Sequence, residues 1–160
     1  MQRILVICVG KLKERFYIDA AAEYCKRLGR YCKLDVVELP EVRLPESPSP
    51  AQVEQALGKE AEAIRAKLPP SSSVVALCVE GKLCSSEELA QFLANSSNRG
   101  EKGLVFLIGS SNGLHPSIKD AAQLRLSMSP MTFPHHLARV MLLEQIYRGF
   151  QINEGSRYHK

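Results

Sequence analysis

Long apolar runs are absent from this sequence, and their absence excludes whole classes of protein. None of the hydrophobic stretches approaches the ~18 residues that a membrane-spanning helix needs. The opening run from Ile4 to Val9 is also too short for a secretory signal peptide, and it leads straight into Gly10-Lys11. We therefore expect a soluble protein of the cytoplasm.

Two phosphate-binding fingerprints are missing as well. Gly10-Lys11 lacks the G-x-x-x-x-G-K-[ST] spacing of a P-loop, and no G-x-G-x-x-G follows any expected strand. These absences disfavour nucleoside triphosphates and a standard dinucleotide as ligands.

Metal-ligand patterns are also lacking. No two cysteines form a C-x-x-C pair, and the four histidines have no spacing that would close a zinc site. We expect no metal and interpret the thiols as free and mostly structural, because cysteine in apolar segments behaves as a small hydrophobe; the alternative is a redox or catalytic role. The residues concerned are Cys8, Cys25, Cys32, Cys78 and Cys84, and His115, His135, His136 and His159.

What is present is the composition and length of one globular domain, which we expect to span residues 1–160. The net charge of +4 is localised, because residues 11–33 hold seven basic side chains against three acidic ones, whereas the rest of the chain carries fourteen of each sign. A basic face of this kind indicates a phosphate-bearing partner. The alternative interpretation is a solvated helix flank.

Apolar strand-like runs alternate with helical periodicity along the chain. This order predicts an α/β fold with a mostly parallel sheet flanked by helices. A connector with four prolines separates the second strand from the second helix, because proline removes a backbone donor. The expected strands are 3–9, 34–39, 74–79, 104–108 and 124–128, and the expected helices are 16–31, 51–68, one opening at 85–88, 117–123 and 134–152.

Two segments follow strands and carry small or polar residues. Ligands collect at the carboxyl ends of strands in open α/β sheets, so both segments are candidate binding sites. The turn from Gly109 to Gly113 would allow a ligand to approach the backbone closely. The loop from Leu126 to Thr132 mixes polar backbone groups with apolar side chains. A plain turn and an ordinary strand-to-helix connection are the alternatives.

The last helix places an arginine on an apolar stripe that also carries Leu143, Ile146 and Phe150. A buried arginine is costly unless paired, so Arg139 should face a carboxylate or a phosphate, either in an internal salt bridge or at a ligand or partner. Apolar residues on most other sides of the helix predict a homodimer through it, with Leu143, Ile146 and Phe150 near the two-fold axis.

The end of the chain combines cations with aromatic rings. Tyr158 and His159 could stack on a base, while Arg157 and Lys160 could take phosphates, as in RNA recognition. Disorder is the default state of such ends.

Together these segments resemble the ribosomal RNA large-subunit methyltransferase H family over essentially the whole chain. The resemblance rests on L-I-G-S-S-N-G at 107–113, L-S-M-S-P-M-T-F-P-H-H-L-A-R-V at 126–140, E-Q-I-Y-R at 144–148 and the terminal Tyr158-His159. That family belongs to the SPOUT class of S-adenosylmethionine-dependent methyltransferases. Its members methylate N3 of a pseudouridine in 23S ribosomal RNA on the assembled ribosome.

The resemblance implies a C-terminal trefoil knot, although knots are otherwise essentially absent from proteins. It also implies S-adenosylmethionine as cofactor, which becomes S-adenosylhomocysteine, and a homodimer that acts on 23S ribosomal RNA. One departure is Gly109-Ser110, where many members have Gly-Gly. The implied cofactor pocket consists of Leu77, Gly109, Ser110, Leu126, Ser127, Met128, Ser129, Pro130 and Met131, and the implied substrate-side residues are His135, Arg139, Tyr158 and His159.

Methyl transfer from a sulfonium requires alignment of donor and acceptor and loss of a proton from the acceptor nitrogen. His135 and His159 are the candidate proton acceptors, whereas water or a nucleotide ionised beside Arg139 is the alternative. Two other functions stay open at this point. One is a non-catalytic ribosome-binding or RNA-binding protein of the same fold, and the other is an enzyme whose Gly109 to Gly113 turn holds a nucleotide phosphate.

Overall fold

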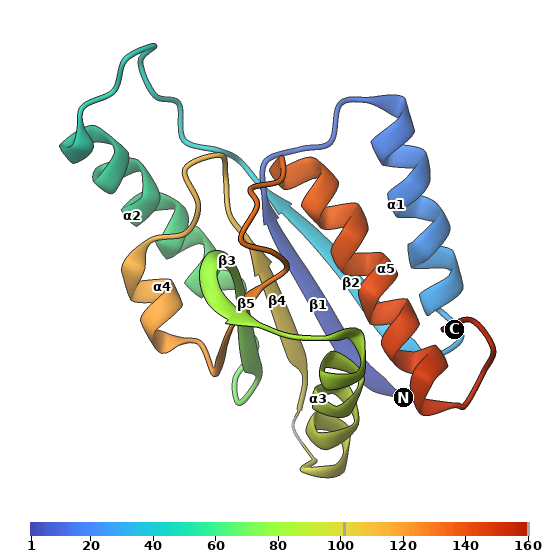
Figure 1. Ribbon diagram of the computed structural model, residues 1–160. Helices are drawn as coiled ribbons and strands as arrows, with labels where there is room; N and C mark the ends of the chain where they lie inside the picture. Colours follow the sequence, from blue (N-terminus) through green and yellow to red (C-terminus); the bar gives the residue numbers. More distant parts are fainter. Residues whose placement is uncertain (101, 160) are drawn as a thin grey trace.

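The computed structural model describes residues 1–100 and 102–159, and in them it contains five strands and five helices (Figure 1). Strands and helices alternate strictly along the described chain, as the sequence predicted. The strands are β1 (Gln2–Val9), β2 (Cys32–Leu39), β3 (Ser73–Leu83), β4 (Leu104–Ile108) and β5 (Leu124–Ser127), and the helices are α1 (Arg15–Leu28), α2 (Pro50–Lys67), α3 (Ser86–Asn98), α4 (Pro116–Ala121) and α5 (His135–Asn153).

All five strands form one parallel sheet in the order β2-β1-β4-β3-β5. The α/β prediction is therefore confirmed. β4 is buried along its whole length, and successive side chains of β1 and β4 point to opposite faces of the sheet. Both faces are consequently covered, as is usual for parallel sheets.

The helices divide between the two faces (Figure 1). One core cluster packs α1, α3 and α5 on side chains such as Ile4, Val6 and Phe106. The other packs α2 and α4 on the intervening side chains, such as Ile7 and Val105. Since each face has its own core, the carboxyl ends of the strands remain the place where a ligand can reach the sheet.

Local sequence signals set the helix ends. Ser49 and Ser85 each form a capping box, with Gln52 and Glu88 respectively, at the start of α2 and α3. The cap expected at residues 85–88 is thus confirmed. Helix α1 ends at Leu28, three residues earlier than predicted, and Gly29 is its C-cap residue.

β3 is longer than the predicted strand 74–79. Leu126 of β5 pairs first with Leu77 and then, after a register shift, with Lys82. At Gly81 a Cβ would lie 2.7 Å from the carbonyl oxygen of Arg125, so only glycine fits this close approach. Apolar patterning could not predict this second pairing, because the extension is largely exposed.

Helix α5 lies between α1 and α3 on the sheet (Figure 1). Leu143 and Ile146 are fully buried in the core of their own chain, and Phe150 stacks on Tyr31. The prediction that Leu143 and Ile146 meet a partner near a two-fold axis is therefore wrong, because the core of their own chain already covers them, whereas Phe150 is half-buried and its predicted role stays a prediction. The outer side of α5 is instead a ridge of half-buried residues, Leu137, Met141, Glu144 and Arg148, hereafter the outer ridge.

All five cysteines are free thiols, as predicted. Burial raises the pKa of Cys8 and of Cys32 to about 11, so neither is a thiolate near neutral pH. Within the described parts of the chain, no helix is long and apolar enough to cross a bilayer.

Candidate functional site

An open cleft of about 320 Å³ lies at the carboxyl ends of β3, β4 and β5. Its walls are residues 77–80 in the second half of β3, the turn after β4, the loop after β5 and the first turn of α5. The two segments singled out from the sequence, 109–113 and 126–132, therefore meet in one place. Parallel strands end at the same edge, which is why residues far apart in the chain come together here.

Most of the predicted cofactor residues line this cleft. Two do not: Ser127 is buried beside it and Pro130 is exposed outside it. Of the predicted substrate-side residues, His135 alone is in the cleft lining. The predicted cofactor residues in the lining are Leu77, Gly109, Ser110, Leu126, Met128, Ser129 and Met131.

The turn after β4 folds back tightly on itself. A Cβ at position 109 would lie 2.3 Å from the carbonyl oxygen of Gly113, so only glycine allows this approach. The N–H of Gly113 donates to the carbonyl oxygen of Ser110 at 2.8 Å. Gly113 itself has a φ of +83°, which side chains rarely adopt. The G-x-x-x-G spacing thus reflects a conformational requirement, and a side chain at 109 would disturb the turn itself.

The loop after β5 is held by its own serines. Ser127 Oγ donates to the carbonyl oxygen of Ser129 at 3.1 Å, and the N–H of Met131 donates to Ser129 Oγ at 2.9 Å. These bonds leave Met128 in the cleft lining and the side chain of Met131 72% exposed. The loop is therefore preshaped, with two flexible apolar side chains available to a ligand.

One ion pair lies in the cleft lining. Lys119 Nζ is 2.6 Å from Glu80 Oε1, and this hydrogen bond lowers the pKa of Glu80. The pair places a cation and an anion side by side, and the rest of the lining combines apolar side chains with uncharged polar ones such as Asn112 and Thr132 and with the ring of His135.

His135 begins α5 at the edge of the cleft. Its ring is half-buried, and burial, together with the neighbouring His136, lowers its pKa. The imidazole is therefore neutral near pH 7 and able to accept a proton. His136 points elsewhere, with Nδ1 3.7 Å from a carboxylate oxygen of Glu14.

Arg139 is buried behind the cleft and is paired within its own chain. Its Nη1 donates to Glu38 Oε2 at 2.7 Å, and its Nη2 donates to the carbonyl oxygen of Gly10 at 3.1 Å. The N–H of Leu12 donates to the same carboxylate oxygen at 3.1 Å. Of the two alternatives left by the sequence, the structure shows the internal salt bridge.

Burial alone would raise the pKa of Glu38, but the hydrogen bonds from Arg139 and Leu12 outweigh it and the pKa is lowered. The sequence reading missed Glu38. The available signal was an acidic residue at the end of the strand 34–39, next to the first strand and thus within reach of a buried cation.

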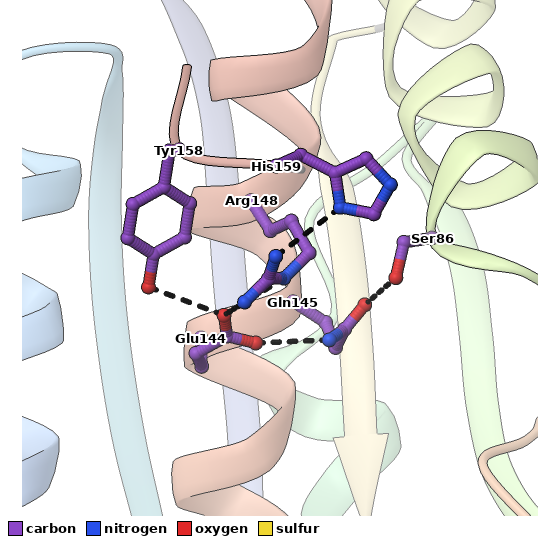
Figure 2. A network of polar contacts seen from close by, with 6 residues as sticks. All are labelled: Ser86, Glu144, Gln145, Arg148, Tyr158 and His159. Carbon is purple, nitrogen blue, oxygen red and sulfur yellow. Dashed lines mark hydrogen bonds and ion pairs between the residues drawn. The ribbon is translucent and has the colours of Figure 1, made fainter. Parts of the chain in front are cut away.

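Tyr158 and His159 lie against α5 and α3 (Figure 2). Tyr158 Oη donates to Glu144 Oε1 at 3.2 Å, and Arg148 lies over the Tyr158 ring. His159 Nδ1 accepts from Arg148 Nη1 at 3.2 Å, and its Nε2 is 2.7 Å from Glu87. The tail therefore closes a polar network on its own chain.

Burial and the nearby Glu144 carboxylate raise the pKa of Tyr158 to about 12, so its hydroxyl stays protonated and is a donor. Along α5, Arg148 comes thirteen residues after His135, which is about 20 Å of helix. Within one chain, then, the structure does not bring Tyr158 and His159 to His135.

Glu60 is a further residue that the sequence reading missed. It lies on α2 beneath the cleft and accepts a hydrogen bond from Ser110 Oγ at 3.1 Å. No motif marks it, because a glutamate within an amphipathic helix is usually solvated. Within residues 1–100 and 102–159, no three or more His, Cys, Asp or Glu side chains are grouped to hold a metal ion.

Solved structures of methyltransferases share this architecture. A probable methyltransferase from Bordetella pertussis superposes with a TM-score of 0.58 at 15% identity, covering 92% of this chain and 96% of that one. A probable methylase family protein from Haemophilus influenzae superposes with a TM-score of 0.54 at 15% identity, covering 96% of this chain and 67% of that one. At these identities the likeness defines the fold class.

The family follows from the sequence itself. The family model described as "Predicted SPOUT methyltransferase" matches residues 2–159, almost the entire chain. The chain belongs to the SPOUT methyltransferase family.

Proposed function

We propose that the protein is an S-adenosylmethionine-dependent RNA methyltransferase that methylates N3 of a pseudouridine in 23S ribosomal RNA on the assembled ribosome. Membership of a methyltransferase family supports the reaction class. The observation that carries the proposal is the cleft at the ends of β3, β4 and β5, with the neutral His135 at its edge. The nucleotide and the ribosomal substrate rest on the resemblance of residues 107–113, 126–140, 144–148 and 158–159 to methyltransferase H proteins.

The cleft suits a nucleoside-bearing sulfonium cofactor. Its volume of about 320 Å³ lies at the lower end of the range for small-molecule sites, and its lining mixes apolar side chains with polar backbone. Leu77, Leu126 and Met128 would supply apolar contacts, and the turn at Gly109 and Ser110 would allow close backbone approach. When bound, S-adenosylmethionine supplies an activated methyl group.

The residues of this chain then have two tasks, alignment and proton removal. His135 is placed to accept the N3 proton, because it lines the cleft and its pKa is lowered. Arg139 donates directly to the carbonyl oxygen of Gly10 and is linked to Leu12 through Glu38, and a Cβ at Gly10 would lie 3.5 Å from His135 Nε2. The arginine therefore supports the surroundings of the base rather than the nucleotide directly.

A homodimer would complete the site. Tyr158 and His159 lie about 20 Å of helix away from His135 in their own chain, so a second copy would have to bring them near the cleft. The outer ridge of α5 offers the half-buried apolar side chains Leu137 and Met141 for that contact. Sedimentation at micromolar concentration should give about twice 17.8 kDa, and a fully active monomer would contradict the dimer.

The trefoil knot and a cytoplasmic location belong to the same proposal. What supports the knot is membership of the SPOUT methyltransferase family.

The proposal is tested by calorimetric titration with S-adenosylmethionine, followed by transfer of a labelled methyl group to ribosomes that lack the modification. We expect micromolar or tighter binding and one methyl group per ribosome, located at N3 of a pseudouridine. Thr132→Trp, an exposed change in the cleft lining, should abolish binding. Ser97→Trp, exposed on α3, is the matched control and should bind normally.

A second candidate is a non-catalytic RNA-binding protein of the same fold. The favouring observation is that Lys11, Lys13, Arg30 and Lys33 are all exposed around α1. Ribosome binding without any cofactor binding would select this candidate and overturn the enzymatic one.

A further inference from the structure

Glu60 is a buried carboxylate without a cationic partner. Its residue is 5% exposed, and among the described residues it forms no ion pair with lysine, arginine or histidine. Burial raises its pKa, and the hydrogen bonds it accepts offset this only in part. A buried, unpaired carboxylate opposes stability. Its role must therefore lie in what it holds in place.

The two oxygens of Glu60 hold two separate segments. Oε1 accepts from Ser110 Oγ at 3.1 Å, in the turn that forms one wall of the cleft. Oε2 accepts from the N–H of Val42 at 2.9 Å, in the proline-rich connector between β2 and α2. One side chain thus joins the connector to the turn.

The turn is a wall shared by two cavities. Its other side, at Ser111 and Asn112, lines a second cavity of about 370 Å³ whose remaining residues belong to the connector. Ser111 Oγ also donates to Glu41 Oε1 at 3.4 Å. Because this turn borders a cavity on each side, few neighbouring atoms pack against it. The hydrogen bond from Ser110 to Glu60 is a buried contact that restrains it.

Helix α2 contacts the segment that follows β4 at two further points. His115 Nε2 is 2.7 Å from Glu54 Oε1, and Arg65 Nη1 donates to Ser117 Oγ at 3.2 Å. Both contacts are exposed, whereas the contact of Glu60 with Ser110 is buried. Of these three contacts, the hydrogen bond between Glu60 and Ser110 is therefore the one least weakened by solvent.

We infer that Glu60 is a positioning residue that holds the turn 109–113 in its cofactor-binding shape through Ser110 and fixes the connector against that turn. This inference rests on the proposed function for the identity of the cofactor. It also gives a physical role to Ser110, which stands where many methyltransferase H proteins have glycine: its hydroxyl is the link to α2.

The test measures S-adenosylmethionine affinity by calorimetry in the full-length chain. Glu60→Ala should weaken binding about tenfold, in line with the loss of a buried hydrogen bond. Glu60→Gln should stay within about threefold of the wild type, because its amide can accept from Val42 N–H and donate to Ser110 Oγ. Glu62→Ala, an exposed glutamate on the same helix, is the matched control and should bind normally.

A double variant separates positioning from general destabilisation. Ser110→Ala alone should weaken binding to a similar degree, and Glu60→Ala combined with Ser110→Ala should be no weaker than Glu60→Ala alone. Full additivity, or wild-type affinity for both single variants, would overturn the inference. Ser110→Ala also serves if Glu60→Ala fails to fold.

Amide hydrogen exchange gives a readout that does not depend on the cofactor. Glu60→Ala should increase exchange at Val42 and at residues 110–113, with exchange in β1 and β4 unchanged. If wild-type protein binds no S-adenosylmethionine but this local change occurs, the cofactor assignment fails and the positioning role holds. Unchanged exchange at the turn would overturn the positioning role itself.

Discussion

Arg139 is a buried cation that takes its partners from the turn after β1 and from the end of β2. Its residue is 4% exposed, and the Glu38 side chain opposite is about one third exposed. Removing one member of such a pair leaves the other charge without compensation, which is more damaging than removing both. At the residue scale, Arg139 binds the end of β2 and the turn after β1 within its own chain.

We expect Arg139→Ala to lower the free energy of unfolding by about 3 kcal/mol, because Glu38 loses its cation. Urea unfolding followed by circular dichroism measures this change. Arg27→Ala, which removes the exposed Arg27–Glu23 pair, is the control and should change stability by less than about 1 kcal/mol.

The double variant Arg139→Ala with Glu38→Leu should recover much of the lost stability, since no unpaired charge remains. If the double variant is as unstable as the sum of the two single variants, the pair is not the reason for the loss.

Glu60 gives the unfolding free energy a distinctive pH dependence. Its pKa is raised above 4.5 in the folded state, chiefly by burial. From about pH 4.5 up to that raised pKa, the folded chain therefore binds more protons than the unfolded chain, and stability falls as pH rises. Glu60→Gln removes this contribution. The difference in stability between wild type and Glu60→Gln should become less favourable to the wild type as the pH rises from about 4.5 through the raised pKa of Glu60.

Urea titrations at a series of pH values measure that difference. All other titratable groups are present in both proteins, so their contributions to the pH dependence of the unfolding free energy cancel in the comparison. A constant difference across this range would show that Glu60 keeps its ordinary pKa.

Among the elements, α3 depends on a short local signal at its start. Ser85 Oγ accepts from the N–H of Glu88 at 3.1 Å, and the N–H of Ser85 donates to Glu88 Oε2 at 2.8 Å. The next residue, Ser86, donates to Gln145 of α5 (Figure 2). The cap therefore fixes both where α3 begins and how it contacts the last helix.

Ser85→Ala should destabilise the protein by about 1 kcal/mol, because one end of the capping box is lost. Chemical denaturation provides the measurement. Ser97→Ala, at an exposed position in the last turn of α3, should be close to neutral. Equal effects at the two positions would mean that the box contributes nothing beyond helix propensity.

At the scale of the whole molecule, the C-terminal residues Tyr158 and His159 are the feature whose role depends on a second chain. Tyr158 and His159 are held by Glu144, Arg148 and Glu87, none of which lines the cleft. If a partner chain uses this tail, then deleting residues 158–160 should leave S-adenosylmethionine affinity unchanged while methylation falls by about 10²–10³.

Single-turnover methylation and calorimetry on the same preparation separate the two quantities. A truncated protein that binds the cofactor poorly but methylates normally at saturating cofactor would reverse this assignment.

The parts that could be predicted from sequence are those that local patterns determine. The apolar runs of β1 and β4 defined the sheet, and small residues after β4 and β5 defined the cleft. Glu38 and Glu60 could not be predicted, because their importance arises from burial next to Arg139 and Ser110, which only the assembled fold creates. Leu143 and Ile146 were misassigned for the same reason, since apolar spacing does not say which neighbour covers a face.

The position of β4 in the sheet determines when the sheet can form during synthesis of the chain. β4 pairs with β1 on one side and β3 on the other, and it is the strand that joins them. Before residue 108 has left the ribosome, β4 cannot pair with β1 or with β3. The edge of β1 that faces away from β2 and the facing edge of β3 therefore stay unpaired. Such non-local pairing slows folding and exposes edges to other chains. A nascent chain stalled before β4 should therefore aggregate, whereas one stalled after β5 should already hold its sheet.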